Sequence, residues 1–267
     1  MGTMLQLFST DGARIPAYAA WPQNPLPSEG QGRAKGAIVV LQEIFGLNGH
    51  IQAVVNGYAA DGYFAIAPAT FERISPGVAL GYTEADIAQG RTYKAAAEAL
   101  AELILSDVQA AVDFAAHAAA GHTPAVALTP AQALGPIGAA PGGVQPTVST
   151  CKVGLVGYCW GGLLAWRSAA RLRGISAAVP YYGGGMHTEL GRTVQCPVMA
   201  HLSHNDASLP MDGVAALLAA YPQVQAHVYP AAHGFNCDQR AAWHAPSALL
   251  ARQRTLAFFV QHLASPD

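Results

Sequence analysis

The segment VGLVGYCWGG, residues 153–162, combines a short apolar run with a glycine-rich turn. The apolar part has the continuous character of a parallel strand that is covered on both faces. Gly157, Cys159 and Gly161 form a G-x-C-x-G pattern, and residues 162–172 are compatible with a helix. In such a nucleophile turn the central residue has a strained backbone, and the flanking residues are glycine because strand and helix pass too close for a Cβ atom. The segment therefore predicts a strand, a sharp turn that presents the Cys159 thiol, and a helix.

Strand and helix patterns alternate on both sides of this segment. Continuous apolar runs, typical of buried strands, occupy residues 37–41, 63–67, 175–182, 198–202 and 224–229. Helical spacing occupies residues 49–60, 92–120 and 246–263. Two short runs at 5–8 and 15–19 flank a Ser-Thr-Asp-Gly turn and predict an N-terminal β-hairpin. The alternation predicts an α/β fold with a mostly parallel central sheet and helices on both faces.

Some of these segments allow more detailed predictions. Ser106 and Asp107 can form an N-cap, so region 92–120 is expected to be two helices that meet there. The closing helix has apolar residues for a buried side at Leu249, Leu250, Phe258, Phe259 and Leu263. Residues 121–150 are rich in glycine, proline and alanine and predict a long surface loop. We therefore expect a single domain, residues 1–267, with a loop insertion at about 121–150.

Composition limits the classes of partner and location. The net charge is -2, only 11% of the 267 residues are charged, and lysine and arginine are scattered, so neither a nucleic-acid nor a membrane partner is expected. The first residues lack a basic region followed by an apolar run, and no stretch of about 18 apolar residues occurs, which favours a soluble, cytoplasmic protein. The four cysteines form no C-x-x-C pair and are expected to be free thiols.

The chain supplies an acid and a base for this nucleophile turn in the order nucleophile, acid, base that α/β-hydrolases use. Asp206 follows the strand pattern at 198–202, and His233 follows the one at 224–229. Cys159, Asp206 and His233 are therefore the predicted catalytic residues. The residues alone leave alternatives: a buried structural cysteine at 159, a surface or helix-capping carboxylate at 206, and a surface histidine at 233.

The other histidines do not indicate a metal site. His201 and His204 lie near Asp206 in sequence, but the local sequence offers no third ligand with suitable spacing. Six others are expected on the surface or at helix caps: His50, His117, His122, His187, His244 and His262. Because no phosphate-binding glycine loop or metal cluster is recognised, we predict neither a metal nor a cofactor.

With these residues in this order, the chain resembles the dienelactone hydrolase (carboxymethylenebutenolidase) family over nearly its whole length. The motifs that carry the resemblance are QEIFGLN at 42–48, FER at 71–73 with Pro76-Gly77, GYCWGG at 157–162 and HGF at 233–235. The resemblance implies an α/β-hydrolase fold. It also implies that Cys159 attacks an ester or lactone carbonyl, that His233 transfers the proton, and that Asp206 orients His233.

The resemblance implies further site residues around the nucleophile. The backbone N–H groups of Ile44 and Trp160 would form the oxyanion hole. Glu43 would contact the resting thiol until substrate displaces it. A carboxylate beside a thiol disfavours the thiolate, whereas a protonated histidine favours it, so Glu43 is expected to modulate the reactivity of Cys159.

The chain departs from the family where two arginines bind the substrate carboxylate. The position four residues after His233 is Cys237, and the position four residues before Tyr93 is Gln89. Tyr93, Gln89 and Cys237 are therefore expected to line the pocket. Loss of both arginines should move substrate choice away from anionic lactones, although Arg240 could turn back toward the site.

The implied function is hydrolysis of lactones or small carboxylic esters, with a small molecule as the only expected partner, through a Cys-His-Asp triad and an acyl-enzyme. Two alternatives remain at this point. One is a broad-specificity carboxylesterase that does not act on dienelactone. The other is a non-catalytic ligand-binding module on the same fold.

Overall fold

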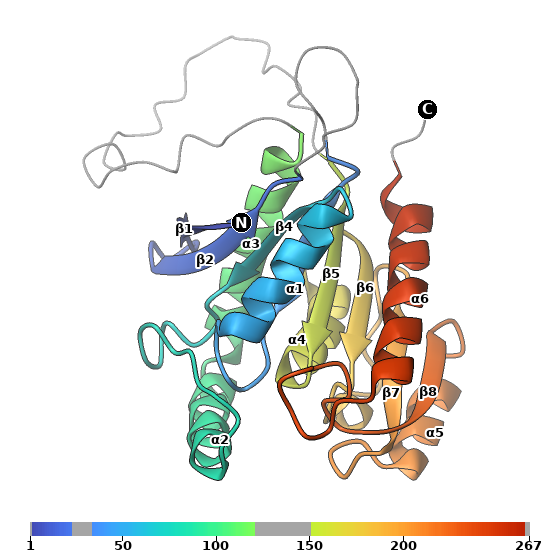
Figure 1. Cartoon of the computed structure of the whole chain (residues 1–267). Helices are drawn as coiled ribbons and strands as arrows, with labels where there is room; N and C mark the ends of the chain where they lie inside the picture. The colour runs from blue at the N-terminus through green and yellow to red at the C-terminus, as the bar shows by residue number, and fades with distance from the viewer. Residues whose placement is uncertain (1, 23–33, 121–150, 265–267) are drawn as a thin grey trace, which may run out of the picture.

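A computed structural model describes residues 2–22, 34–120 and 151–264 (Figure 1). Its centre is an eight-stranded sheet in the order β1-β2-β4-β3-β5-β6-β7-β8. The strands are β1 Thr3–Phe8, β2 Arg14–Ala20, β3 Ala37–Leu41, β4 Phe64–Pro68, β5 Val153–Tyr158, β6 Ile175–Tyr181, β7 Met199–Asn205 and β8 Gln225–Ala232. β1 and β2 form an antiparallel hairpin that continues antiparallel onto β4, and β3 to β8 are parallel. The predicted N-terminal hairpin and mostly parallel sheet are confirmed.

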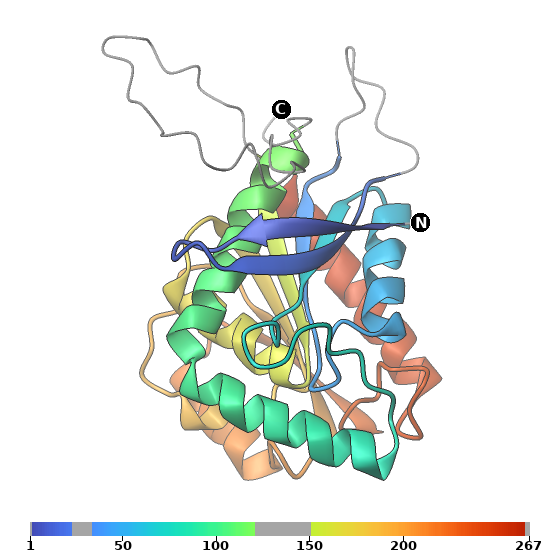
Figure 2. The same ribbon diagram turned by 90° about the vertical axis from the view of Figure 1, so that its left-hand side faces the viewer.

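Helices cover both faces of the sheet, as predicted. They are α1 Gly49–Ala60, α2 Glu84–Ala99, α3 Ala101–Ala118, α4 Trp160–Arg171, α5 Met211–Ala220 and α6 Ala245–Leu263, with a short 3-10 helix at Met186–Thr188. α1 and α6 pack on one face, and α3, α4 and α5 pack on the other (Figure 1). Figure 2 looks onto the hairpin edge, with α2 crossing below the hairpin. The parallel strands run downward in Figure 1, so their carboxyl ends meet at the lower edge of the sheet.

Two apolar cores, one on each face of the sheet, explain the continuous apolar runs of the sequence. In β3, Ala37, Val39 and Leu41 belong to the core under α3 and α4. The alternate residues Ile38 and Val40 belong to the core under α1 and α6. Side chains alternate between faces along a strand, so a strand covered on both faces needs apolar residues at every position. Full burial of each of the larger side chains contributes about 1.5–3 kcal/mol.

The predicted break within 92–120 is wrong in position. α2 already begins at Glu84, after a capping box that Thr83 forms with Asp86, and the break between α2 and α3 lies at Leu100. Asp107 is buried inside α3, where the Arg73 guanidinium donates two hydrogen bonds of 2.8 and 2.7 Å to its carboxylate. Asp107 therefore anchors a tertiary ion pair and does not cap a helix.

The predicted buried side of the closing helix is wrong in part. Phe258, Phe259 and Leu263 are buried, but Leu249 is 62% exposed and Leu250 is 41% exposed. The first turns of α6 bury the small residues Ala248 and Ala251 instead, so the larger leucines point outward. Helix α5 was not predicted, and the predicted 121–150 loop lies outside the described residues.

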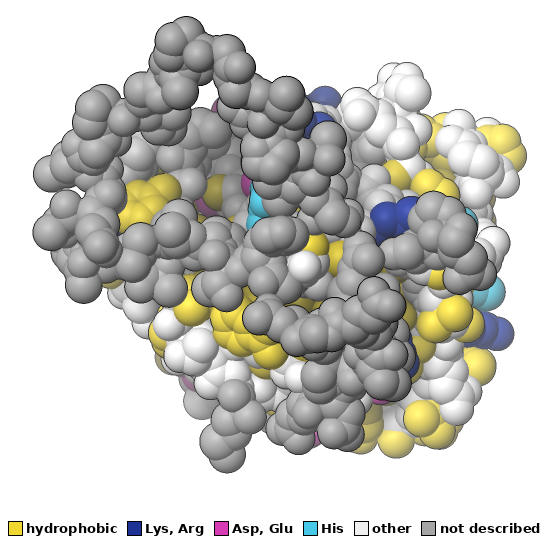
Figure 3. Space-filling view, turned by 90° about the horizontal axis from the view of Figure 1, so that it is seen from above, with side chains coloured by type: hydrophobic (Ala, Val, Ile, Leu, Met, Phe, Trp, Pro, Cys, Tyr) yellow, Lys and Arg dark blue, Asp and Glu magenta, His cyan; other side chains and the backbone are white. Residues whose placement is uncertain are grey.

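Few charged side chains of the described residues are visible on the upper face of the molecule. In Figure 3, which views the molecule from above, the visible lysine and arginine side chains occur in small separate groups among hydrophobic and uncharged ones. This view therefore shows no continuous basic surface on the described part of the chain. None of the described helices is long and apolar enough to cross a membrane.

Candidate active site

The turn between β5 and α4 holds Cys159 in a strained backbone conformation. Its φ and ψ are 56° and -118°, and Cys159 and Tyr182 alone have a positive φ among the described non-glycine residues. A Cβ on Gly157 would lie 1.9 Å from the Gly161 oxygen, and one on Gly161 would lie 2.4 Å from the Leu41 oxygen. Contacts this short leave no room for any side chain. Both glycines are therefore required for β5 and α4 to approach each other while Cys159 stands clear of the sheet.

Asp206 and His233 meet at the same edge of the sheet. Asp206 directly follows β7, and His233 directly follows β8, which pairs in parallel with β7. The His233 Nδ1 lies 2.7 Å from Oδ2 of the buried Asp206 carboxylate, and Asp206 Oδ1 accepts a hydrogen bond from the Ser208 N–H at 2.8 Å. We assign the Nδ1 proton to this pair because a buried carboxylate accepts hydrogen bonds. The Nε2 atom is therefore the ring nitrogen that remains to exchange a proton with a thiol.

The surroundings of His233 favour its protonated form. Burial alone lowers the pKa of His233, but the charge of the neighbouring Cys159 sulfur and hydrogen bonds with Asp206 and Cys159 outweigh it and raise that pKa. The Tyr182 ring packs edge-on against the imidazole at 5.1 Å. The arrangement can hold an imidazolium beside a thiolate, which is the reactive form of a cysteine nucleophile.

The two predicted oxyanion-hole residues lie at the carboxyl ends of β3 and β5. Neither the Ile44 nor the Trp160 N–H forms a backbone hydrogen bond in the described part of the chain. α2 packs tightly on this region, since a Cβ on Gly90 would lie 2.5 Å from the Ile44 oxygen. The Trp160 ring stacks on Phe71 at 4.8 Å, and its Nε1 donates a hydrogen bond to Glu98 at 2.6 Å. Both N–H groups are therefore held by rigid packing and remain available as donors.

Arg240 turns back and pairs with Glu43. Its Nη1 lies 2.9 Å from Oε1 of Glu43, whose side chain is 1% exposed, and its guanidinium lies 5.4 Å from the centre of the Phe45 ring. Glycine is favoured at position 234 because its φ is 86°, and a Cβ there would also push the Arg240 guanidinium away, since it would lie 2.3 Å from Nη1. Glu43 Oε2 is buried without a hydrogen-bond partner among the described residues. Glu43 thus lies in the site, and the hydrogen bond that holds it comes from Arg240.

The residues expected to line the pocket have different surroundings. Tyr93 is half-buried against Phe71 at 5.8 Å, whereas Gln89 is exposed on α2. Cys237 is buried, and burial together with the Glu43 charge raises the pKa of its thiol to about 11. Of these three residues, Cys237 lies next to Glu43. Gln89 does not.

His50 is part of the site, although it was expected on the surface or at a helix cap. It is buried at the start of α1. One side-chain N, O or S atom from each of His50, Glu43 and Cys237 lies within 4.8 Å of the other two. These are ligand types that zinc uses. The Arg240 guanidinium on Glu43 already places a positive charge there, which opposes a divalent cation, so we assign no metal to this group. The sequence signal was that Glu43 and His50 follow β3 and Cys237 follows β8, so all three lie near the carboxyl ends of parallel strands at one sheet edge.

Comparisons with known proteins agree with the resemblance seen in the sequence motifs. The sequence pattern of the Dienelactone hydrolase family matches residues 15–129 and 143–263. A carboxymethylenebutenolidase from Pseudomonas putida is 29% identical over 255 residues, which cover 93% of this chain and 95% of that protein. A Synechocystis sp. protein that has carboxymethylenebutenolidase as a provisional name is 33% identical over 241 residues, covering 85% of this chain and 86% of the relative.

Solved structures agree with the fold. The crystal structure of a Klebsiella pneumoniae subsp. pneumoniae MGH 78578 protein, provisionally named a dienelactone hydrolase, superposes with a TM-score of 0.69 at 27% identity and covers 98% of both chains. A Pyrococcus furiosus esterase shares the fold, with a TM-score of 0.61 at 12% identity over 99% of this chain and 94% of that one. The predicted α/β-hydrolase fold is thereby confirmed. The chain belongs to the dienelactone hydrolase family.

Proposed function

We propose that this hydrolase cleaves lactones or small carboxylic esters through Cys159, His233 and Asp206, with a covalent acyl-enzyme intermediate. The observation that carries the proposal is the strained turn that presents Cys159 next to His233, while Asp206 holds the other ring nitrogen at 2.7 Å. A nucleophile, a base in contact with it and a group that orients the base are the parts that covalent acyl transfer requires.

In the acylation step, the Cys159 thiolate attacks the carbonyl carbon and the electron pair of the C=O bond moves to oxygen. The N–H groups of Ile44 and Trp160 are the proposed donors to this oxyanion, and each such donor contributes about 10²- to 10³-fold in rate. The intermediate collapses with cleavage of the C–O bond, and His233 gives its Nε2 proton to the leaving alkoxide. In a lactone the resulting alcohol remains attached to the acyl group.

In the deacylation step, His233 takes a proton from a water molecule that attacks the thioester carbonyl. The C–S bond breaks, the carboxylic acid leaves and the Cys159 sulfur regains the imidazolium as its partner. Asp206 stays ionised and stabilises the imidazolium in both half-reactions. The cycle consumes one ester and one water and needs no redox partner.

The surroundings of Arg240 favour uncharged substrates. Arg240 is the basic group at this site, and its Nη1 is engaged by Glu43. A substrate carboxylate would have to share the guanidinium with a buried carboxylate of the same charge, which costs binding free energy. Gln89, at the position of one family arginine, is exposed on α2 and supplies no charge. These features support small neutral esters and lactones as the preferred class.

The test of this substrate class compares kcat/KM for p-nitrophenyl acetate, p-nitrophenyl butyrate, cis- and trans-dienelactone, and the uncharged carboxamide analogue of each lactone. We expect the carboxamide lactones to be opened about tenfold faster than the acids, because charge repulsion by Glu43 is removed. Faster opening of the acids would contradict this preference. Absence of turnover with every compound would support the non-catalytic alternative.

Glu43 is proposed to keep the resting thiol unreactive. Glu43→Gln removes the carboxylate but can still accept a hydrogen bond from Arg240, so the fold should be preserved. We expect iodoacetamide to alkylate Cys159 about tenfold faster in this variant, because removal of one nearby negative charge favours the thiolate. Quantification of the alkylated Cys159 peptide by mass spectrometry measures the rate. Glu84→Gln, at an exposed position of α2, is the control and should react like the wild type. An unchanged rate for Glu43→Gln would disprove this role.

A further inference from the structure

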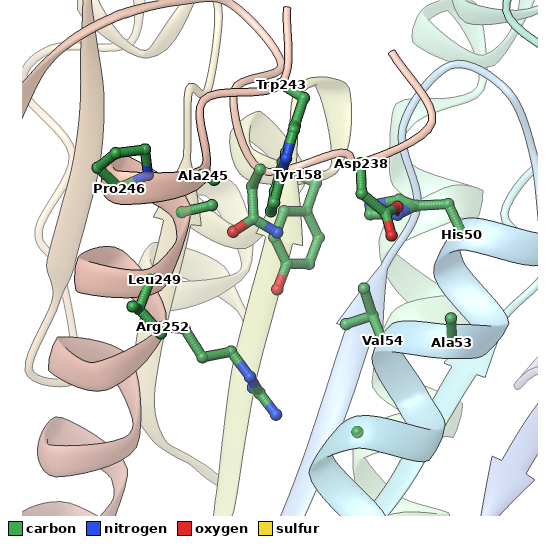
Figure 4. Close-up of a pocket in the computed structure, with 13 residues that line it drawn as sticks. His50, Ala53, Val54, Tyr158, Asp238, Trp243, Ala245, Pro246, Leu249 and Arg252 are labelled. Atoms are coloured by element: carbon green, nitrogen blue, oxygen red, sulfur yellow. Dashed lines mark ion pairs between the residues drawn. The ribbon is translucent and has the colours of Figure 1, made fainter.

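A second concave site lies between α1 and α6, on one face of the sheet (Figure 4). It has a volume of about 740 Å³ and is lined mainly by apolar side chains, such as Ala53 and Val54 of α1 and Leu249 of α6. Small-molecule sites typically have volumes of about 300–1,000 Å³. None of the three proposed triad residues lines this cavity. His50, which lies beside Glu43 and Cys237, does line it. The cavity is therefore a candidate ligand site that adjoins the active site without containing the triad.

The inner end of this cavity carries hydrogen-bond donors. Figure 4 shows the Tyr158 hydroxyl, from β5, and the Arg252 guanidinium, from α6, pointing toward the same part of the space between the two helices. Burial raises the pKa of Tyr158 well above its ordinary value, so the hydroxyl keeps its proton, which it can donate to the neighbouring Tyr58 hydroxyl or to a ligand. These two groups provide a positive charge and a neutral donor at one end of an apolar space.

Arg252 retains unused donor capacity. Its Nη2 donates to Asp61 Oδ2 at 2.5 Å, and its guanidinium lies 4.0 Å from the centre of the Tyr58 ring. Nη1 has no hydrogen-bond partner among the described residues, although it is buried. A guanidinium has five N–H donors, and a buried donor without a partner destabilises the folded chain. A ligand carboxylate that accepts from Nη1 would share the guanidinium with Asp61. The Asp61 side chain is 35% exposed and its repulsion is screened by water, whereas the Glu43 side chain that shares Arg240 is only 1% exposed.

The rim of the cavity exposes large apolar side chains. Trp243 is 41% exposed and Leu249 is 62% exposed, and both line the cavity. Contiguous exposed apolar side chains around a hollow often mark a binding site. On the α1 side, His50 Nδ1 lies 3.5 Å from the largely exposed Asp238. The negative charge of Asp238 disfavours an anionic group at the α1 end of the cavity. A ligand with one carboxylate would therefore bind with that carboxylate toward Arg252.

We propose that this cavity binds a small, mainly apolar molecule that carries one carboxylate. The carboxylate accepts hydrogen bonds from Arg252 and Tyr158, and the apolar body lies between Val54, Leu249 and Trp243. Arginine is suited to this task because its planar fork matches the two oxygens of a carboxylate. Binding at this site does not depend on turnover at Cys159.

The experiment is isothermal titration calorimetry of the full chain with 4-biphenylacetate and with the neutral 4-biphenylacetamide. We expect one equivalent of the carboxylate to bind, with an affinity about tenfold higher than that of the amide, since a charge-assisted hydrogen bond is roughly twice as strong as a neutral one. Ala53→Phe places a ring in the cavity and should weaken binding by about tenfold or more. The matched control is Ala60→Phe, an exposed position of the same helix that does not line the cavity, which should bind within about twofold of the wild type.

Two further variants test whether Arg252 binds the ligand carboxylate and whether binding is independent of the catalytic residues. Arg252→Gln should lower affinity for the carboxylate but not for the amide, and a thermal melt on the same sample checks that loss of the Asp61 contact has not unfolded it. Cys159→Ala should bind the carboxylate with wild-type affinity even if it hydrolyses nothing. The proposal is overturned if the wild type does not bind, if the amide binds equally well, or if Ala53→Phe binds like Ala60→Phe. Loss of binding in folded Cys159→Ala would also overturn it by placing the ligand in the active site.

Discussion

Cys159→Ala is expected to lower kcat/KM for p-nitrophenyl acetate by about 10⁴-fold or more, as removal of a triad nucleophile does in other acyl-transfer enzymes. The fold should survive, because Cys159 is only partly buried and alanine is smaller. Alanine does share the strained positive φ at this position, so a thermal melt of each sample accompanies the assay. Initial rates of p-nitrophenol release over a range of substrate concentrations give kcat/KM.

The matched control is Cys196→Ala, which removes a second partly buried thiol away from the site. Burial raises the pKa of Cys196 to about 11, and it lies in the segment before β7, so its loss should leave kcat/KM unchanged. Cys159→Ser tests the thiol more finely. If His233 and Glu43 are matched to a thiolate, the serine variant should be much slower than the wild type. Wild-type activity in Cys159→Ala would rule out Cys159 as the nucleophile.

Asp206→Asn is expected to lower kcat by about 10³- to 10⁴-fold while leaving the site geometry intact. An asparagine amide can donate to Nδ1 of His233, and this would place the imidazole proton on Nε2, the atom that must accept the proton from Cys159. Asp206 is also one of the groups that raise the pKa of His233, so the pKa of the histidine should fall in the variant. The limb of the pH–rate profile that reports the imidazolium should therefore move to lower pH.

Asp212→Asn is the control for this prediction. Asp212 is exposed in the first turn of α5, close to Asp206 in sequence and without contact with His233. We expect its kcat and pH profile to match those of the wild type. Equal activity of Asp206→Asn and Asp212→Asn would show that the carboxylate at 206 neither orients nor stabilises the base.

Local sequence patterns predicted the elements that are fixed by burial and by backbone crowding. The run at 37–41 had to be a doubly covered strand, because both faces of β3 are buried. The turn at Cys159 could be predicted from Gly157 and Gly161, because the close contacts in such a turn exclude a Cβ atom at both positions. Asp206 and His233 could be placed together because the carboxyl ends of parallel strands share one edge. Each of these inferences needed only nearby residues and general rules of the fold.

Features that depend on contacts between residues far apart in the chain could not be predicted from local sequence patterns. Arg240 and Glu43 are 197 residues apart, and no periodicity reveals that one pairs with the other. Asp107 looked like a helix cap because its partner, Arg73, comes from another part of the chain. Leu249 has the spacing of a core residue, but the cavity between α1 and α6 leaves it exposed. Tertiary contacts outweigh local propensity at such positions.

The central claim is that Cys159 forms an acyl-enzyme, and trapping that intermediate tests it most directly. The wild-type protein is mixed with excess p-nitrophenyl acetate, quenched in acid during turnover and digested, and the peptides are identified by mass spectrometry. The mechanism predicts an acetyl group on Cys159, which should accumulate further in Asp206→Asn if deacylation is the slower step in that variant. Turnover with an acetyl group on another residue, such as Cys237, or with no acetylated peptide from any quench time, would contradict the account.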